Sequence, residues 1–316
     1  MKILLIQRKA LGDALYTSLI GKVLKEEIEG VEVGFLTLKP MCELLEKLNF
    51  IDKCFAYTDF WNSLGKIRDF SPEVVLDYEA TFKTYPLVLL SGAKKRIAFF
   101  AKKREKYLYL IYTDRIKKEH FGYTFWDRLK LLKPLGIDYK KFFKFIPLEE
   151  SKSEENFVVF SPKGKIKTKE IKPEVVALIK ERIENELNVE VKVFVEPKEV
   201  EYIELLKKNG IKPYTLGLKD FYEFVKKSKG VLTIEGFAQH LGLLLNKRVL
   251  TIIQSRYPWF EERFDRLFYY YPSLDCLGCS KNTCPKGSYE CTYKIDAEEI
   301  VKLVGRFILN HPTVQP

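Results

Sequence analysis

Short apolar runs alternate with segments of helical spacing along the chain. Residues 3–6 form a continuous apolar run, which is typical of a strand buried on both faces of a parallel sheet. A turn at residues 11–13 follows, and residues 15–28 then carry an apolar stripe at helical spacing with Asp13 at the position of an N-cap. The pattern therefore predicts that the chain opens with a strand, a loop and a helix.

The same alternation continues through two halves. In the first, strands are expected at residues 31–37, 53–57, 73–78 and 95–99, and helices at residues 41–48 and 121–135. In the second, strands are expected at residues 157–160, 189–195, 230–235 and 249–254, and helices at residues 173–187, 198–209, 220–228 and 238–245. The polar stretch at residues 148–156 between them has no periodicity, so it is the expected linker.

This order of elements predicts an α/β protein of two Rossmann-like domains, residues 1–150 and residues 156–295. Its 316 residues exceed the size at which one core usually stops growing, which also favours two domains. A ligand is expected beyond the carboxyl ends of the strands, in a central cleft that the two domains face. A last helix at residues 297–309 is expected to pack back on the first domain, within a terminal segment of residues 296–316.

The lengths of the apolar runs also indicate where in the cell the protein is located. The run at residues 3–6 is too short for a signal peptide, and no run approaches the length of about 20 residues that spans a bilayer. We therefore expect a cytoplasmic protein.

A net charge of +11 predicts an anionic partner. The surplus is concentrated in residues 94–118, where ten lysines and arginines face two acidic residues and alternate with aromatic residues. A solvated, lysine-rich surface of a heat-adapted protein accounts for this segment equally well.

The opening KILLIQRKALGDALYTSLIGKVL resembles the first strand, loop and helix of the heptosyltransferase family of glycosyltransferases. In that family the Asp of the Gly-Asp pair is the proposed general base, a role that falls on Asp13. LDYEATFKT resembles a second family element and places Asp77 and Lys83 in the acceptor site, although Glu79 and Ala80 stand where the family has Gln and Gly. The simpler reading is a helix cap at Asp13 and a solvated Lys83.

The second half carries the donor elements of this resemblance. FSPKGKIKTKEIKPE resembles the loop that holds the donor pyrophosphate, with Ser161 and Lys169 as its ligands, although the family's Trp is absent. Glu199 matches the acid that binds the nucleotide ribose. GVLTIEGFAQHLGLLLNKRVLTI resembles the strand, turn and helix beside the donor, with Glu235 in the place of an Asp and His240 matching a His. Without that match, His240 reads as a core histidine.

Four of the six cysteines form a C-x2-C-x4-C-x6-C run, Cys276, Cys279, Cys284 and Cys291. This density suggests a structural zinc, an iron–sulfur site or disulfides, and the sequence leaves the choice open. Cys42 and Cys54 are interpreted as buried thiols.

The resemblance implies a GT-B glycosyltransferase that inverts the anomeric centre and needs no metal or other cofactor. Its donor would be ADP-heptose, and its acceptor an acidic glycolipid of the lipopolysaccharide inner core, reached from the inner face of the cytoplasmic membrane. Another nucleotide-sugar is the nearest alternative, because the turn at Glu235 departs most from the family pattern. A non-catalytic protein that binds polyanions or membranes is a second, although no nucleic acid partner is expected. A dinucleotide oxidoreductase is disfavoured because neither first strand is followed by GxGxxG.

Overall fold

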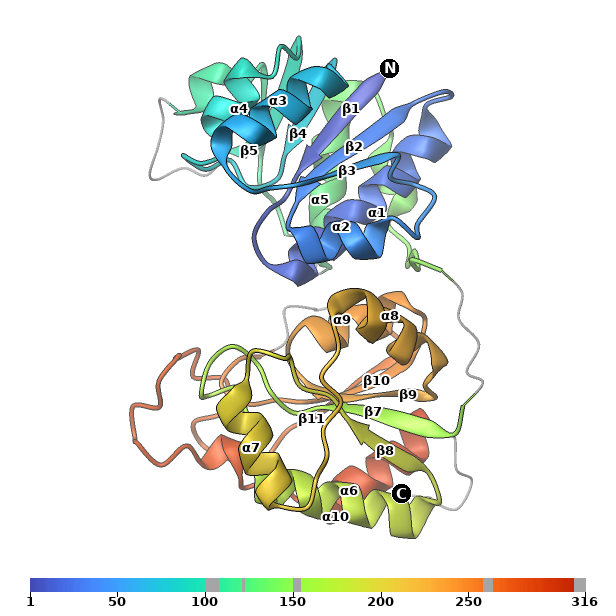
Figure 1. The fold of residues 1–316 in the computed structure, drawn as a ribbon, viewed down its shortest axis with the longest axis vertical. Coiled ribbons are helices and arrows are strands. Elements are labelled where there is room, and N and C mark those ends of the chain that lie inside the picture. Colours follow the sequence, from blue (N-terminus) through green and yellow to red (C-terminus); the bar gives the residue numbers. More distant parts are fainter. Residues whose placement is uncertain (101–107, 121–122, 150–154, 258–263, 310–316) are drawn as a thin grey trace. The chain divides into compact units, whose positions relative to one another are not determined.

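A computed structural model describes residues 1–100, 108–120, 123–149, 155–257 and 264–309 (Figure 1). The described residues divide into two compact units, one formed by residues 1–146 and the other beginning at residue 147. The boundary falls next to the expected linker at residues 148–156, of which residues 150–154 lie outside the described residues.

The first unit is built on one parallel sheet with the strand order β3-β2-β1-β4-β5-β6. Its strands are β1 (Lys2–Ile6), β2 (Glu32–Thr37), β3 (Lys53–Ala56), β4 (Val74–Asp77), β5 (Lys95–Phe100) and β6 (Asp114–Lys117). The side chains of Ile3 to Ile6 are fully buried, as the continuous apolar run predicts. The sheet therefore has helices on both faces, which is the usual architecture for a parallel sheet.

The helices of this unit are α1 (Leu11–Glu27), α2 (Lys39–Leu45), α3 (Phe60–Phe70), α4 (Tyr85–Leu90) and α5 (Thr124–Leu129). Three single turns of 3₁₀ helix, η1 (Leu108–Ile111), η2 (Lys130–Leu135) and η3 (Tyr139–Phe142), complete it. Helices α1 and α5 pack on each other, and α3 packs beside α4. The contact between α1 and α5 matters below, because α1 carries Asp13 and α5 carries Arg128.

The second unit has a parallel sheet of order β11-β10-β9-β7-β8. Its strands are β7 (Phe157–Ser161), β8 (Glu190–Val193), β9 (Gly230–Ile234), β10 (Arg248–Ile252) and β11 (Leu267–Tyr270). Its helices are α6 (Pro173–Leu187), α7 (Val200–Lys208), α8 (Leu218–Lys227), α9 (Phe237–Leu244) and α10 (Ala297–Leu303), with short turns η4 (Glu290–Thr292) and η5 (Val304–Ile308). A separate buried core fills this unit.

Local chemistry explains where several helices begin and end. Pro173 opens α6 at the first helical position, and Asn188 ends it in the left-handed conformation. The carboxylate of Asp296 caps α10 by accepting hydrogen bonds from the N–H groups of Glu298 and Glu299. Helix α10 then packs against α6, and η5 packs against β10, so the last helix belongs to the second unit.

Two local expectations differ from the structure. Asp13 was expected to be the N-cap of the first helix. Helix α1 instead begins at Leu11 with Ala10 as its N-cap, so Asp13 is the third residue of the helix. Cys42 and Cys54 are joined in a disulfide with their Cα atoms 5.4 Å apart, because α2 and β3 bring them together. The interpretation of these two cysteines as free thiols is therefore wrong. Among the residues that the structure describes, no helix is both long enough and apolar enough to cross a membrane.

Candidate functional site

The two sheets each have one place where the order of strands reverses direction. In the first unit this switch lies between β1 and β4, and in the second it lies between β7 and β9. The loops that follow these strands separate there and leave room for a ligand at the carboxyl edge of the sheet. The residues expected to be functional follow these strands, so each unit is described from its switch point outward.

Asp13 is held by Arg128, which lies on α5 near the end of the sequence of the first unit. Its Oδ1 accepts from Nη2 of Arg128 at 2.6 Å, and Nε of the same guanidinium donates to the buried Thr17 hydroxyl at 2.9 Å. The Asp13 side chain remains 45% exposed. Arg128 thus fixes the direction of the carboxylate while the group stays accessible to a reactant.

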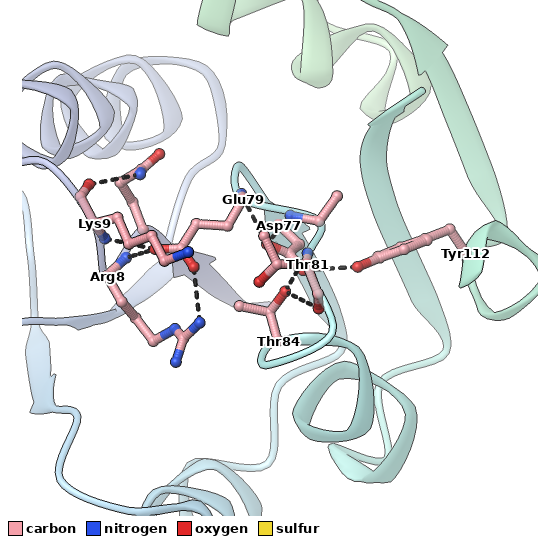
Figure 2. Close-up of polar contacts among 9 residues, drawn as sticks. Arg8, Lys9, Asp77, Glu79, Thr81, Thr84 and Tyr112 are labelled. Carbon is pink, nitrogen blue, oxygen red and sulfur yellow. Dashed lines mark hydrogen bonds and ion pairs between the residues drawn. The ribbon is translucent and has the colours of Figure 1, made fainter. Parts of the chain in front are cut away.

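The loops after β1 and β4 are joined by a buried ion pair (Figure 2). Glu79 accepts hydrogen bonds from the backbone N–H groups of Arg8 and Lys9, and its other oxygen receives Nη2 of Arg8 at 2.8 Å. The side chains of Arg8 and Glu79 are only 4% and 3% exposed, and the Arg8 guanidinium lies over the Tyr57 ring. Glu79, which departs from the family pattern, therefore pins the loop that leads into α1 and Asp13.

Asp77 is fully buried below Glu79. Its Oδ2 accepts from the Tyr112 hydroxyl at 2.7 Å, and its Oδ1 accepts from the backbone N–H groups of Glu79 and Ala80 (Figure 2). Burial raises the pKa of Asp77, opposed by these hydrogen bonds. Asp77 shapes the turn that ends in the exposed Lys83, and contact of either residue with an acceptor stays a prediction.

At the switch point of the second unit, Lys169 and Glu235 form an ion pair. Lys169 comes from the loop after β7 and Glu235 directly follows β9, and their side chains are 15% and 13% exposed. Burial and the nearby Arg256 lower the pKa of Lys169 to about 8, in spite of its carboxylate partner. The site therefore holds a poorly solvated ammonium group at the edge where an anionic ligand is expected.

The loop after β7 folds back on itself. Lys163 and Glu170 form an antiparallel bridge, and the Gly164 N–H donates to the Lys169 carbonyl at 2.7 Å. Lys163 forms ion pairs with Glu170 at 2.5 Å and with Glu199 at 3.6 Å. A Cβ at Gly164 would lie about 3.0 Å from the Cβ and the carbonyl oxygen of Lys169, so a larger residue would be crowded in this turn. Lys169 and Glu199 are thus linked through Lys163.

The remaining donor candidates lie on the same edge. Ser161 ends β7 and is buried, and its carbonyl accepts from the Thr233 hydroxyl on β9 at 3.1 Å. His240 lies half-buried in the first turn of α9, five residues after Glu235. The structure therefore brings the loops of Ser161, Lys169, Glu235 and His240 to two adjacent strands, whereas the roles assigned to them stay predictions.

The four clustered cysteines lie on the loop between β11 and α10, and their thiols are not bonded to one another. Burial and the nearby thiols of Cys276, Cys279 and Cys284 raise the pKa of Cys291 to about 11. Within the described ranges, no group of three or more His, Cys, Asp or Glu side chains is arranged to hold a metal ion. The four thiols form no disulfide among themselves, and a metal at these cysteines stays a prediction.

The described basic residues of the segment 94–118 are of two kinds, those bonded to backbone carbonyls and those exposed to solvent. Lys95 donates to the Pro134 carbonyl and Arg96 donates to the Ile111 and Ala93 carbonyls, so both stabilise the fold. Four others are exposed, namely Lys94, Arg115, Lys117 and Lys118. Lys102, Lys103, Arg104 and Lys106 lie outside the described residues.

Sequence reasoning missed Arg128 and Glu79 as parts of the site. Arg128 is 115 positions from Asp13, and nothing in its surroundings marks it as a partner. Glu79 lies after β4, which pairs with β1 in the structure, and Arg8 after β1 offers the opposite charge, but only the strand order shows that the two residues meet.

Comparison with protein-family models and with curated protein sequences gave no match. Solved structures do match over nearly the whole chain. A glycosyl transferase family 9 protein from Veillonella parvula DSM 2008 is 14% identical with a TM-score of 0.78, covering 98% of this chain and 97% of that one. An E. coli ADP-heptose lps heptosyltransferase II is 14% identical with a TM-score of 0.75, covering 98% and 99%. The E. coli heptosyltransferase WaaC with ADP is 12% identical with a TM-score of 0.71, covering 97% of each chain. The chain therefore has the GT-B fold of two Rossmann-like units that these glycosyltransferases share.

Proposed function

We propose that this chain is an inverting glycosyltransferase of the heptosyltransferase family, which transfers heptose from ADP-heptose to an acidic glycolipid of the lipopolysaccharide inner core. The observation that carries the proposal is the buried pair of Lys169 and Glu235 at the switch point between β7 and β9. A sugar nucleotide offers a diphosphate to the ammonium group and hydroxyls to the carboxylate. The shared fold supports this reading, since solved relatives of that fold bind ADP and ADP-2-deoxy-2-fluoro heptose.

In the proposed reaction, Asp13 acts on the acceptor. Its carboxylate takes the proton of the acceptor hydroxyl while that oxygen forms a bond to the anomeric carbon of the donor. The bond between the anomeric carbon and the diphosphate oxygen breaks, and ADP leaves with the electron pair. Arg128 holds the Asp13 carboxylate in one orientation, which is the requirement for an in-line displacement.

The second unit supplies the charge for the leaving group. Lys169, His240 and the N–H groups at the start of α9 stabilise the departing diphosphate, with Ser161 beside them. Glu235 binds sugar hydroxyls and Glu199 binds the ribose. In this scheme protein cations do the work that a metal ion does in other glycosyltransferases, so EDTA should leave turnover unchanged.

In this proposal the first unit binds the acceptor, through Asp77 and Lys83, and also contacts the membrane. Large apolar side chains are exposed on α3, α4 and η1, namely Trp61 at 76%, Leu110 at 75% and Leu89 at 47%. Helix α3 is joined to α4 by a hydrogen bond from Arg68 to the Leu90 carbonyl at 3.0 Å. Lys94 follows α4, so apolar groups and cations occur together, as in a peripheral contact with an anionic membrane.

Vesicle sedimentation tests the membrane contact. The protein should bind vesicles that contain phosphatidylglycerol and not neutral vesicles, and high salt should release it. Trp61→Ser combined with Leu110→Ser should weaken binding, whereas Leu178→Ser, at an exposed leucine of α6 in the second unit, should not. Equal binding by both variants would contradict the assignment of this surface.

Transfer from a different nucleotide-sugar is the second candidate function, and the identity of residue 235 as glutamate supports it. The longer acid and the following Gly236 and Phe237 change the turn that reads the donor in the family pattern. A protein that only binds polyanions is the third, and it predicts no response to any nucleotide.

A thermal-shift panel of ADP, UDP, GDP and CDP separates these candidates. ADP alone should raise the melting temperature, because a ligand that binds only the folded state stabilises it by mass action. A shift with another nucleotide would move the donor assignment, and no shift at millimolar ligand would reject glycosyl transfer. Asp13→Asn should then retain ADP binding and lose about 10²- to 10⁴-fold in turnover.

A further inference from the structure

Arg256 lies at the same edge of the second sheet as Lys169 and Glu235. It follows β10, which pairs with β9 in parallel register, and the loops after these neighbouring strands leave the sheet side by side. Its positive charge is close enough to contribute to the low pKa of Lys169. Two cations therefore lie near each other, and Lys169 is paired with the carboxylate of Glu235.

The guanidinium of Arg256 is only partly satisfied. Nη2 donates to the Asn282 side-chain oxygen at 3.1 Å, while Nε is buried and has no acceptor in the described part of the chain. No carboxylate lies within ion-pair distance of Arg256 among the same residues. Arg256 therefore carries a charge that no described carboxylate neutralises, and its remaining guanidinium N–H groups can donate to an anionic ligand.

The cysteine-rich loop holds the segment that carries Arg256. The Ser280 N–H donates to the Ser255 carbonyl at 2.6 Å, and the Gly278 N–H donates to the Gln254 carbonyl at 3.0 Å. The Gln254 side chain in turn donates to the carbonyls of Glu170 and Cys291 at 2.8 and 2.9 Å.

The cysteine-rich loop also contacts the loop after β7 that carries Lys169. The Thr168 hydroxyl donates to the Lys281 carbonyl at 2.8 Å, next to Asn282, and the Lys172 N–H donates to the Thr292 carbonyl at 2.8 Å. The loops of Lys169 and Arg256 are thus fixed to one scaffold, which sets the spacing of the two cations.

We propose that Arg256 and Lys169 together form a two-cation site for the donor diphosphate, and that Asn282 positions Arg256 in it. The inference rests on the proposed function and assigns its phosphate site a second ligand. The planar guanidinium binds two phosphate oxygens at once, whereas the Lys169 ammonium acts as a point charge. Asn282 holds one nitrogen of Arg256 and so restricts the orientation of its guanidinium.

Calorimetric titration of the full chain with ADP and with adenosine tests the site. Arg256→Ala should weaken ADP binding by about tenfold to a hundredfold, because a charged hydrogen bond is lost, and should leave adenosine binding unchanged. Arg256→Lys should recover part of the loss. Asn282→Ala should weaken ADP binding by less than Arg256→Ala, again without an effect on adenosine.

Arg266→Ala is the matched control, since it removes the same charge from an exposed residue at the amino end of β11, and ADP binding should not change. If the unaltered protein binds ADP and Arg256→Ala binds it equally well, the two-cation site is wrong while the proposed function stands. If Arg256→Ala loses ADP and adenosine alike, the residue is structural and the inference fails. If the unaltered protein binds neither ligand, the proposed ADP donor and the inference fail together.

Discussion

Glu79 shows how one buried carboxylate can order a loop that carries chemistry elsewhere. It neutralises Arg8 and accepts two backbone N–H groups from the loop that leads into α1. Removing one member of a buried ion pair leaves the other charge without compensation. The position of Asp13 therefore depends on a residue that does not touch it.

A double-mutant cycle measures the interaction between Glu79 and Arg8. Glu79→Ala should destabilise the chain by about 3–5 kcal/mol, because Arg8 stays buried without its partner. Glu79→Gln should cost less, since an amide oxygen still accepts from the backbone of Arg8 and Lys9. In the Glu79→Ala background, Arg8→Met should cost far less than it does alone, as judged by urea unfolding. Additive costs would show that the two side chains do not interact.

The low pKa of Lys169 predicts that ADP binding depends on pH. Only the protonated ammonium attracts a diphosphate, and its pKa of about 8 means that the charge is present below pH 8 and lost above it. Affinity for ADP should be nearly constant up to about pH 7, be about half as high by pH 8, and fall toward pH 9.5 by up to about tenfold per unit. The second pKa of a phosphate is about 6, so the diphosphate is fully ionised above pH 8, where the main fall is expected.

Lys169→Arg is the control, because a guanidinium stays charged throughout. Its affinity for ADP should be flat over the same range in calorimetric titrations. An equally steep fall in this variant would assign the dependence to another group.

At the scale of elements, the parallel strands and their helices were predictable from hydrophobic pattern. Helix α6 was predicted with its observed bounds because Pro173 marks its start and the pattern stops at Leu187. Strands β6 and β11 were not expected, since both are four-residue edge strands, and β6 alternates charged and partly buried residues. Helix α3 was also missed, although Asp59 caps it and Leu64, Ile67 and Phe70 bury one face.

The candidate site was predictable only as far as its residues follow strands. Ser161, Lys169 and Glu235 come after β7 and β9, so a sheet of known order brings them to one edge. The partner of Asp13 was not predictable, because contact between α1 and α5 depends on how helices separated by most of the unit pack together. Sequence pattern thus locates loops, and packing decides which side chains meet.

The disulfide between Cys42 and Cys54 gives a prediction at the same scale. It closes a loop over 12 positions between α2 and β3, and a loop of this length contributes about 3 kcal/mol in the chain-entropy model. Reduction, or Cys42→Ala with Cys54→Ala, should therefore lower the midpoint of urea unfolding of the first unit. Peptide mapping after alkylation under native conditions should recover Cys42 and Cys54 linked, with Cys276 and Cys279 alkylated. Alkylation of Cys42 would contradict the pairing.

The molecule as a whole divides its chemistry between two units with separate buried cores. Asp13, Arg128 and the exposed cations of residues 94–118 belong to the first unit, whereas the diphosphate candidates all belong to the second. The basic residues also serve different purposes. Arg96 and Arg8 stabilise the interior, whereas Lys94 and Arg115 face solvent.

This division predicts that residues 147–316 form an autonomous nucleotide-binding fragment. Their sheet, helices and core are complete without the first unit, so the fragment should unfold cooperatively by circular dichroism. It should bind ADP within a few-fold of the full chain and show no transfer activity, since Asp13 is missing. Lys169→Ala should weaken ADP binding in the fragment and in the full chain alike. A folded fragment that fails to bind ADP would mean that the first unit contributes donor contacts, because the diphosphate ligands proposed for the second unit would then be insufficient.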